Sequence, residues 1–246
     1  MNARNVKKII IEEKTGNKYL IKDLDDDFHT SVGIVLSKDL RSNKSKITSN
    51  KGAKFTVIDP FFPDLWEQLQ RGPQVMIAKD IGLIMAKTGV GKNSKCVDAG
   101  GGSGSLCLSL ANICKEITTY EANSEHYEIL LKNKKLFGAE NLMVKKQNIY
   151  QGITETELDL ITLDLPEPWL VLQQAQKVLK EGGFLAVYLP NIIQAKQFID
   201  ATYNTEIRFL EMVEVMERKW LVEDKILRPE FQMLGHTGFL IFCRRL

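Results

Sequence analysis

The chain has 246 residues, of which 44% are hydrophobic and 26% are charged. This is the composition of an ordinary globular protein, and it excludes an intrinsically disordered chain. No uncharged apolar run approaches the roughly 20 residues that a membrane-spanning helix needs, and the polar start MNARNVKK lacks the apolar core of a secretory signal. We expect a cytoplasmic protein without a membrane partner.

Positive charge is concentrated at the front of the chain. The formal net charge is +2, but residues 1–60 carry 12 Lys and Arg against 8 Asp and Glu. This excess suits a domain that contacts phosphates, although solvated surface lysines are the commoner origin of such a bias.

The four cysteines form no CxxC pair. Cys96 and Cys243 fall in apolar, strand-like runs, where a thiol behaves as a small hydrophobic side chain. We expect neither a disulfide framework nor a zinc site, and no other metal.

Residues 1–60 are expected to form a small all-β domain, a barrel or a meander, because short apolar runs alternate there with turn-forming residues. Residues 61–90 are expected to connect this domain to the next. The segment DPFFPDLWEQLQRGP holds three of the seven prolines, and a helical pattern follows from Lys79 to Lys87.

Strand and helix patterns alternate in residues 91–246, which predicts an α/β domain with a parallel sheet. The predicted strands are KCVDAG, ITTYEA, LMVKKQ, LDLITLDL and GGFLAVYLP, and the helices between and after them cover residues 105–114, 124–137, a stretch ending at 180, and 191–203. The last two strand-like runs, IRFLEMVEVMERKWLV and HTGFLIFCRR, have no helix between them. One must therefore run antiparallel, which gives a Rossmann-like seven-stranded sheet with a terminal antiparallel hairpin.

A glycine-rich loop, VDAGGGSG (97–104), joins the first of these strands to a helix. Backbone amides in such a loop can approach a ligand closely. The dinucleotide-binding fingerprint would require a glycine at position 105, where serine stands, so the spacing is GxGxG. Asp98 would repel a pyrophosphate but can face a cationic sulfonium or amino group.

Glu121 follows the second predicted strand, where a carboxylate can take both hydroxyls of a bound ribose. Together with the glycine loop, it favours a nucleoside ligand over a plain glycine-rich turn. The loop, the acidic residue and the antiparallel last strand are typical of class I S-adenosylmethionine (SAM)-dependent methyltransferases. We therefore expect SAM as the cofactor and S-adenosylhomocysteine as its product.

Asp164 ends the fourth predicted strand in the segment DLPEPW, at the sheet edge where open α/β folds bind ligands. Two prolines stiffen the turn, and a carboxylate beside an exocyclic amine can take up its proton during methyl transfer. Asp164 is the predicted catalytic residue. The alternative is a helix N-cap, and both roles can hold at once. Trp169 is expected to pack in the core.

Over nearly its whole length, the chain resembles the tRNA (adenine-N1)-methyltransferases that modify the T-loop adenine. The matching motifs are RGPQ (71–74), the glycine loop, YE (120–121), LDLPEPW (163–169), YLP (188–190) and RPEFQMLGHTGFL (228–240). The resemblance implies an N-terminal β-domain that contacts tRNA and a SAM-dependent catalytic domain. It also implies a homotetramer, which is typical of the archaeal and bacterial members.

The resemblance also assigns roles to single residues. Asp164 would hold the amino group of the target adenine and leave N1 free to attack. Cofactor contacts are expected from Gln74, Asp98, Gly100, Gly102, Ser103, Gly104, Ser105, Glu121, His126, Gln147, Asn148 and Asp164. Substrate contacts are expected from Ile77, Pro190 and His236. For His126 a helix-surface position is an equal alternative, and for His236 a hairpin position is the alternative.

Two positions depart from the family pattern. Ile77 stands where an aromatic residue is usual, so a ring that stacks on the flipped base, worth about 1 to 3 kcal/mol, is absent. The segment Ala122-Asn123-Ser124 lacks the usual arginine. For the missing ring at Ile77 we expect weaker capture of the adenine without loss of the chemistry, or its replacement by another aromatic residue.

The predicted reaction is in-line methyl transfer to N1 of one T-loop adenine or of two neighbouring ones. One alternative is a methyltransferase for a protein or a small metabolite, which leaves RPEFQMLGHTGFL and the front domain unexplained. Another is a non-catalytic tRNA-binding subunit. Such a subunit should have lost the glycine loop and Asp164, and both are intact.

Overall fold

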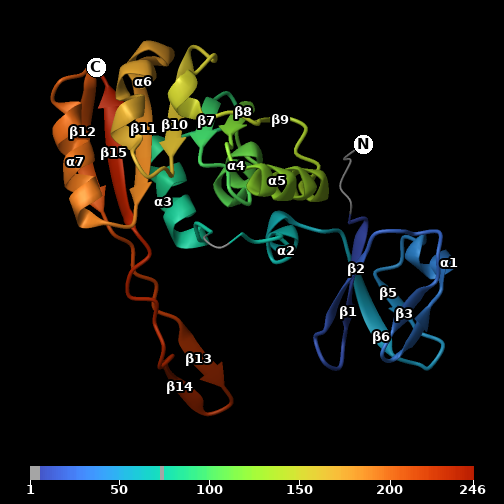
Figure 1. Ribbon diagram of the computed structural model, residues 1–246. Coiled ribbons are helices and arrows are strands. Elements are labelled where there is room, and N and C mark those ends of the chain that lie inside the picture. Colours follow the sequence, from blue (N-terminus) through green and yellow to red (C-terminus); the bar gives the residue numbers. More distant parts are fainter. Residues whose placement is uncertain (1–5, 73–74) are drawn as a thin grey trace. The chain divides into compact units, whose positions relative to one another are not determined.

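The computed structural model describes residues 6–72 and 75–246 and divides the chain into two compact units (Figure 1). The first unit comprises residues 1–69 and 132–138, and the second comprises residues 70–131 and 139–246. The boundary near residue 60 stays a prediction. In the described ranges, every helix is too short or too polar to cross a bilayer.

The first unit is built on an antiparallel sheet in the order β2-β1-β6-β5. Its elements are β1 (Lys8–Glu12), β2 (Lys18–Ile21), the hairpin of β3 (Phe28–Thr30) and β4 (Gly33–Val35), α1 (Ser37–Leu40), β5 (Lys46–Thr48), β6 (Lys54–Ile58) and α2 (Phe62–Trp66). Its core is formed by Ile10, Ile21, Val35, Leu40, Ile47 and Phe55. The predicted β-rich character is confirmed. Strand β3 and helix α1 were not predicted, because three or four residues are too few to show a period.

The second unit contains a seven-stranded sheet in the order β12-β15-β11-β10-β7-β8-β9. The strands are β7 (Lys95–Ala99), β8 (Glu116–Tyr120), β9 (Leu142–Lys145), β10 (Leu158–Leu163), β11 (Leu179–Leu189), β12 (Ile207–Val213) and β15 (Phe239–Arg245). Strands β7 to β11 are parallel, and β15 runs antiparallel between β11 and β12. The expected sheet with its terminal antiparallel pair is confirmed.

Helices and short turns connect these strands. They are α3 (Ala78–Thr88), α4 (Ser105–Ala111), α5 (Ser124–Phe137), η1 (Ile149–Gln151), η2 (Pro168–Val171), α6 (Leu172–Val178) and α7 (Ile192–Thr202). The bounds of α5 match the prediction, whereas α6 ends at Val178 because Leu179 already begins β11. Trp169 packs against the core as expected.

The run IRFLEMVEVMERKWLV, predicted as one strand, is two. Strand β12 ends at Val213, and β13 (Trp220–Glu223) pairs with β14 (Ile226–Pro229) in a separate two-stranded hairpin (Figure 1). Asp224 adopts a left-handed φ of 46°, which forms the tight turn between these strands. His236 was predicted on the last strand, but β15 begins only at Phe239.

All four cysteines are free, buried and located in the second unit: Cys96, Cys107, Cys114 and Cys243. Cys96 lies in β7 and Cys243 in β15, as their apolar surroundings predicted. The Sγ atoms of Cys96 and Cys114 are 3.4 Å apart. Across the described residues, no group of three or more His, Cys, Asp and Glu side chains is arranged to hold a metal ion. The absence of a metal stays a prediction.

Candidate active site

The predicted site residues gather at one edge of the sheet. Because β7, β8, β10 and β11 are parallel, their carboxyl ends meet at the same edge. The segments that follow these four strands carry, in turn, the glycine loop, Glu121, Asp164 and Pro190.

The glycines of the loop serve two different purposes. Gly100 has a φ of +84°, and a β carbon on it would lie 2.1 Å from the backbone oxygen of Asp164. Gly104 has a φ of +90°, and its β carbon would lie 2.4 Å from the side chain of Leu130. Gly102, with a φ of +52°, would meet nothing closer than 3.7 Å. Packing therefore requires glycine at 100 and 104, whereas Gly102 has no such close neighbour, and its half-buried backbone leaves room for a ligand to approach.

Glu121 is hydrogen-bonded to the glycine loop. Its Oε2 accepts from the backbone N–H of Gly102 at 2.7 Å, and its Oε1 accepts from that of Asn123 at 2.7 Å. The residue is 7% exposed, so its orientation is fixed. Each carboxylate oxygen keeps a further lone pair, which can accept from a ribose hydroxyl. The open backbone at Gly102 and the fixed carboxylate beside it fit a nucleoside cofactor such as SAM.

Asp98 is buried between neighbouring strands. Its Oδ1 accepts from Thr162 Oγ1 and its Oδ2 from Thr119 Oγ1, both at 2.7 Å. Burial outweighs these bonds and raises the pKa of Asp98 to about 6. Its contact with a cationic part of the cofactor stays a prediction, since both carboxylate oxygens already accept hydrogen bonds from threonines of neighbouring strands.

Asp164 follows β10 directly and is held by its backbone. Its N–H donates to the carbonyl of Ala99 at 2.9 Å, while its carboxylate has no hydrogen-bond partner among residues 6–72 and 75–246. The residue is exposed to solvent, but the neighbouring protein still desolvates its carboxyl in part. Desolvation, aided by the negative charge of Asp98, raises its pKa to about 7. Asp164 caps none of the described helices, because the N-cap of η2 is Glu167 and that of α6 is Val171.

The remaining predicted cofactor residues lie around this edge. His126 is half-buried on α5, and a β carbon on Gly72 would lie 3.9 Å from its Nε2, so Gly72 lies near the start of α5. Asn148 caps η1, its Oδ1 accepting from the N–H of Tyr150 at 3.0 Å. Ser103 and Ser105 are buried, Gln147 is half-buried, and Gln74 lies outside the described residues. Their contacts with the cofactor stay predictions.

Two predicted substrate residues contact each other. His236 Nε2 lies 3.2 Å from the backbone oxygen of Pro190, and its Nδ1 is hydrogen-bonded to Glu214. Glu214 first, and then the Pro190 oxygen, raise the pKa of His236, and both favour N–H groups on its ring nitrogens. Ile77, the third predicted residue, immediately precedes α3 and is half-buried.

A buried polar cluster beside these residues was not predicted. The Nζ of Lys79 donates to Asp80 at 2.7 Å and to Thr237 Oγ1 at 2.6 Å, and Thr237 Oγ1 donates to the other oxygen of Asp80 at 2.9 Å. The hydroxyl of Tyr188 donates to the backbone oxygen of Thr237 at 2.6 Å. The cluster fixes the segment that carries His236. Its only signal in the sequence was that its members lie in or next to the family motifs, since they are up to 158 residues apart.

A family model described as the tRNA methyltransferase complex GCD14 subunit matches residues 54–228. The chain belongs to this family. The matched range includes the glycine loop, Glu121 and Asp164. SAM is the cofactor of this methyltransferase family and fold.

Several relatives of this family member are similar over nearly its whole length. It is 30% identical to the tRNA (adenine(57)-N(1)/adenine(58)-N(1))-methyltransferase TrmI of Methanocaldococcus jannaschii, covering 96% of this chain and 94% of the relative. It is 29% identical to the tRNA (adenine(58)-N(1))-methyltransferase TrmI of Thermus thermophilus, covering 96% of each.

Two solved structures share the fold of this GCD14-family chain. The SAM-dependent O-methyltransferase of Thermotoga maritima superimposes with a TM-score of 0.81 at 25% identity, covering 98% of this chain and 93% of that one. The tRNA (m1A58) methyltransferase TrmI of Aquifex aeolicus superimposes with a TM-score of 0.76 at 25% identity, covering 99% and 98%. The predicted class I methyltransferase fold is thereby confirmed.

Proposed function

We propose that this protein transfers a methyl group from SAM to N1 of an adenine in the T-loop of tRNA. The observation that carries the proposal is the free carboxylate of Asp164 beside a glycine loop and a fixed Glu121, in a chain whose similar relatives are named as enzymes of this reaction. The enzyme acts in the cytoplasm, where mature tRNA is abundant.

The chain's own residues supply position and electrostatics. SAM, when bound, supplies an electrophilic methyl group that adenine N1 can attack directly. The Asp164 carboxylate accepts a hydrogen bond from the exocyclic amino group of the adenine, which orients N1. Its negative charge stabilises the positive charge that develops on the base. Glu121 holds the ribose of the cofactor through its remaining lone pairs. His236 and Pro190 line the acceptor side.

The test is to incubate the purified protein with an unmodified tRNA transcript and labelled SAM, digest the RNA and identify the labelled nucleoside. We expect 1-methyladenosine, and none of it when the target adenine is replaced by guanine. Measurable SAM binding with no label in any tRNA would contradict the proposed acceptor. Unchanged 1-methyladenosine formation by Asp164→Ala would contradict the role of Asp164.

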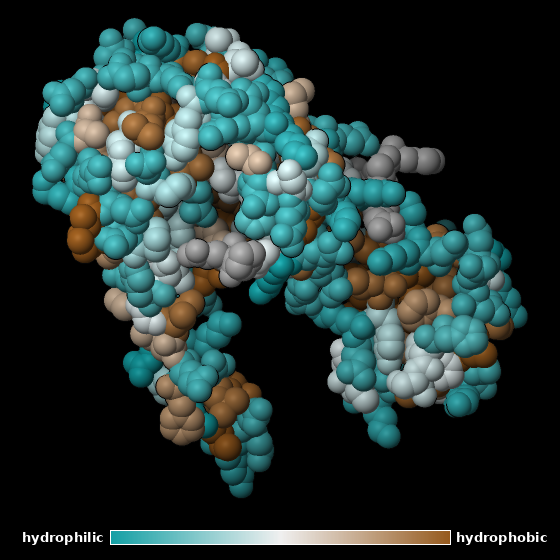
Figure 2. Space-filling view, in the orientation of Figure 1, coloured by the Kyte–Doolittle hydropathy of each residue, from teal (hydrophilic) through white to brown (hydrophobic). Residues whose placement is uncertain are grey.

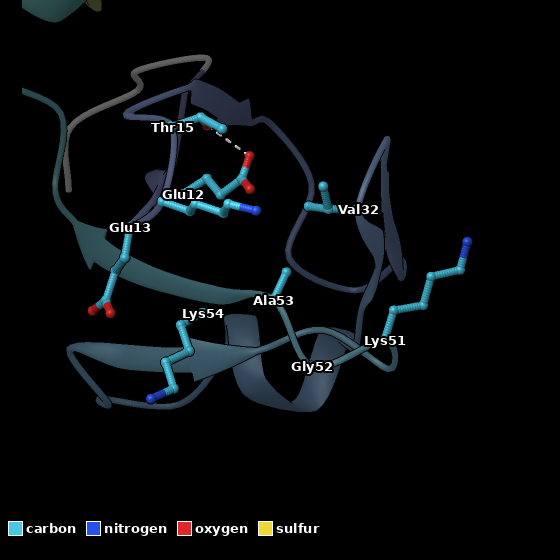
Figure 3. A pocket seen from close by; sticks show the side chains of 9 residues that line it. Glu12, Glu13, Thr15, Val32, Lys51, Gly52, Ala53 and Lys54 are labelled. Atoms are coloured by element: carbon cyan, nitrogen blue, oxygen red, sulfur yellow. Dashed lines mark hydrogen bonds between the residues drawn. The ribbon is translucent and has the colours of Figure 1, made fainter.

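The N-terminal unit is the proposed contact for tRNA phosphates. A groove of about 750 Å³ in this unit is lined by Glu12, Glu13, Lys14, Thr15, Val32, Lys51, Gly52, Ala53 and Lys54 (Figure 3). Lys14, Lys51 and Lys54 form no ion pair with any described residue, so their charges are available to a polyanion. Glu13, by contrast, is paired with Lys46 at 2.9 Å.

A homo-oligomer is the proposed assembly, and the β13–β14 hairpin is its proposed contact. A two-stranded hairpin is marginally stable alone, and this one projects from the sheet with large apolar side chains in the open (Figures 1 and 2). Val222 and Leu227 are each 70% exposed, and Phe231 beyond them is 89% exposed. A second copy of the chain would cover them.

Sedimentation of wild type and of Val222→Glu/Leu227→Glu tests this assembly. We expect a tetramer for wild type and a smaller species for the variant. Tyr203→Glu is the matched control, because Tyr203 is 76% exposed at the end of α7, outside the hairpin. A monomeric wild type at micromolar concentration would contradict the proposal.

A further inference from the structure

The DLPEP loop (164–168) must be placed by groups other than the carboxylate of Asp164. That carboxylate has no hydrogen-bond partner in the described part of the chain, so its position depends on the backbone that carries it. On the β7 side, this backbone is fixed by the N–H of Asp164, which donates to Ala99, and by the tight approach of Gly100. Residues 166 and 167 extend away from this anchor and need others.

The first of these anchors comes from η1. The hydroxyl of Tyr150 accepts a hydrogen bond from the backbone N–H of Glu167 at 3.3 Å. Tyr150 is itself held at both ends of its backbone. Its N–H donates to Asn148 Oδ1 at 3.0 Å, and its carbonyl accepts from Gln174 Nε2 at 3.1 Å. Partial burial raises the pKa of Tyr150, so the phenol stays neutral and keeps lone pairs for an N–H donor.

The second anchor comes from α7. The Nε2 of Gln194 donates to the backbone oxygen of Pro166 at 3.0 Å. Gln194 lies in the first turn of α7, which Asn191 caps by accepting from the N–H of Ile193 at 2.7 Å. A capped first turn is well ordered, so it offers a fixed point from which Gln194 can hold the loop.

We propose that Tyr150 and Gln194 are positioning residues of this methyltransferase, which hold the DLPEP loop from two elements so that the Asp164 carboxylate meets the acceptor. They act through the backbone of Pro166 and Glu167, without touching the reacting groups. The turn that carries Tyr150 is capped by Asn148, a predicted cofactor residue. This turn therefore connects a predicted cofactor contact to the DLPEP loop. The proposal rests on the proposed function only for the identity of the acceptor.

Tyr150→Phe and Gln194→Met test this role, since each removes the hydrogen-bonding group and keeps most of the volume. Tyr203→Phe and Gln197→Met are the matched controls, because these side chains are exposed and form no hydrogen bond within the described residues. A displacement of the reacting groups by about 1 Å can cost on the order of 100-fold in rate. We expect kcat to fall at least about tenfold in each test variant, with KM for tRNA and Kd for SAM within about twofold of wild type.

A second readout needs no tRNA. Asp164→Asn removes a carboxyl of raised pKa, so the difference in melting temperature between this variant and wild type depends on pH. In the Tyr150→Phe and Gln194→Met backgrounds, the DLPEP loop should be less fixed and the Asp164 carboxyl better hydrated, which lowers its pKa. We therefore expect the pH range over which the melting-temperature difference changes to move to lower pH. This result would support the proposal even if tRNA proved to be the wrong acceptor.

Each variant decides by itself, so the failure of one to fold leaves the other as the test. Wild-type kcat in a folded Tyr150→Phe or Gln194→Met protein would overturn the proposal. A change in KM alone, or an equal loss of kcat in the two control variants, would also overturn it.

Discussion

The cofactor side and the acceptor side of the sheet edge differ in how their acidic residues are held. On the cofactor side, Glu121 accepts from Gly102 and Asn123, and Asp98 accepts from two threonines. On the acceptor side, the carboxylate of Asp164 has no hydrogen-bond partner in the described ranges. Carboxylates that hydrogen bonds already hold in place bind the cofactor at little entropic cost. The carboxylate of Asp164, which has no such bonds, is available to the acceptor base. Substitutions on the two sides should therefore separate SAM binding from methyl transfer.

Asp164→Asn should have the largest effect, because it removes the carboxylate that is proposed to hold the amino group of the acceptor. We expect kcat for tRNA methylation to fall by about 10²- to 10⁴-fold, as is usual on loss of an acid–base group. Binding of SAM, measured by calorimetry, should weaken far less than kcat falls, although Asp164 is also an expected cofactor contact. A loss of SAM affinity as large as the loss of kcat would show that the two sides are not separate.

Gly100→Ala should come next, because its β carbon would lie 2.1 Å from the backbone oxygen of Asp164 and must displace the catalytic loop. We expect a loss of roughly 100-fold in kcat. Gly89→Ala is the control, since Gly89 has a similar φ of +65° but nothing within 4 Å of its β carbon. Equal kinetic losses in both variants would attribute the effect to backbone strain.

Glu121→Gln should act on the other side of the comparison. The amide keeps one acceptor but loses the charge, and a hydrogen bond to a charged group is worth about 1.5 to 3 kcal/mol. We expect the Kd for SAM to rise by about tenfold or more, with kcat at saturating SAM little changed. A fall in kcat with unchanged Kd would contradict the assignment of Glu121 to the cofactor.

The pH dependence should separate the acceptor side further. With a pKa of about 7, Asp164 is the carboxylate only above that pH, so kcat/KM should rise as the pH increases through about 7, and Asp164→Asn should abolish this limb. The folded state binds this proton more tightly than the unfolded state, whose pKa is near 3.8. Asp164 therefore costs stability increasingly as the pH rises from about 4 to about 7, and Asp164→Asn should raise the melting temperature at pH 8 more than at pH 5.

Reversing two lysines of the groove should have the smallest effect, because they lie in the other unit. We expect Lys51→Glu/Lys54→Glu to weaken tRNA binding and to reduce the slope of log K against log salt by about 0.9 for each phosphate that is no longer neutralised. Lys22→Glu/Lys38→Glu, at two exposed positions of the same unit outside the groove, is the charge-matched control. Equal changes in slope for the two variants would indicate that tRNA responds to the general positive charge of the unit and does not bind at the groove.

The features of this protein that the sequence predicts are those whose residues lie close together along the chain. Strands β7 to β11 and helix α5 were predicted because each has a strong period of its own. The glycine loop and Glu121 were predicted because they lie within one βαβ unit. The hairpin β13–β14 was missed, since its apolar side chains face outward and resemble a buried strand.

The interactions that hold the site together were beyond such patterns. Tyr188 and Thr237 are 49 residues apart, and Gln194 and Pro166 are 28 apart. A single tyrosine or glutamine has no period, so only the folded chain reveals its partner. The capping alternative for Asp164 failed for a related reason, because η2 begins at Pro168 and its N-cap is therefore Glu167, three residues after Asp164.

The placement of the cysteines gives the enzyme a reporter of its own opening. All four thiols are buried in the second unit, and the first unit has none. The rate at which an alkylating reagent modifies the native protein therefore measures how often the catalytic sheet opens, while the N-terminal unit remains silent. Cys96, next to Val97 and Asp98, lies in the strand that leads into the glycine loop. Slower alkylation of Cys96 when SAM is added would therefore report ligand binding in the wild-type protein.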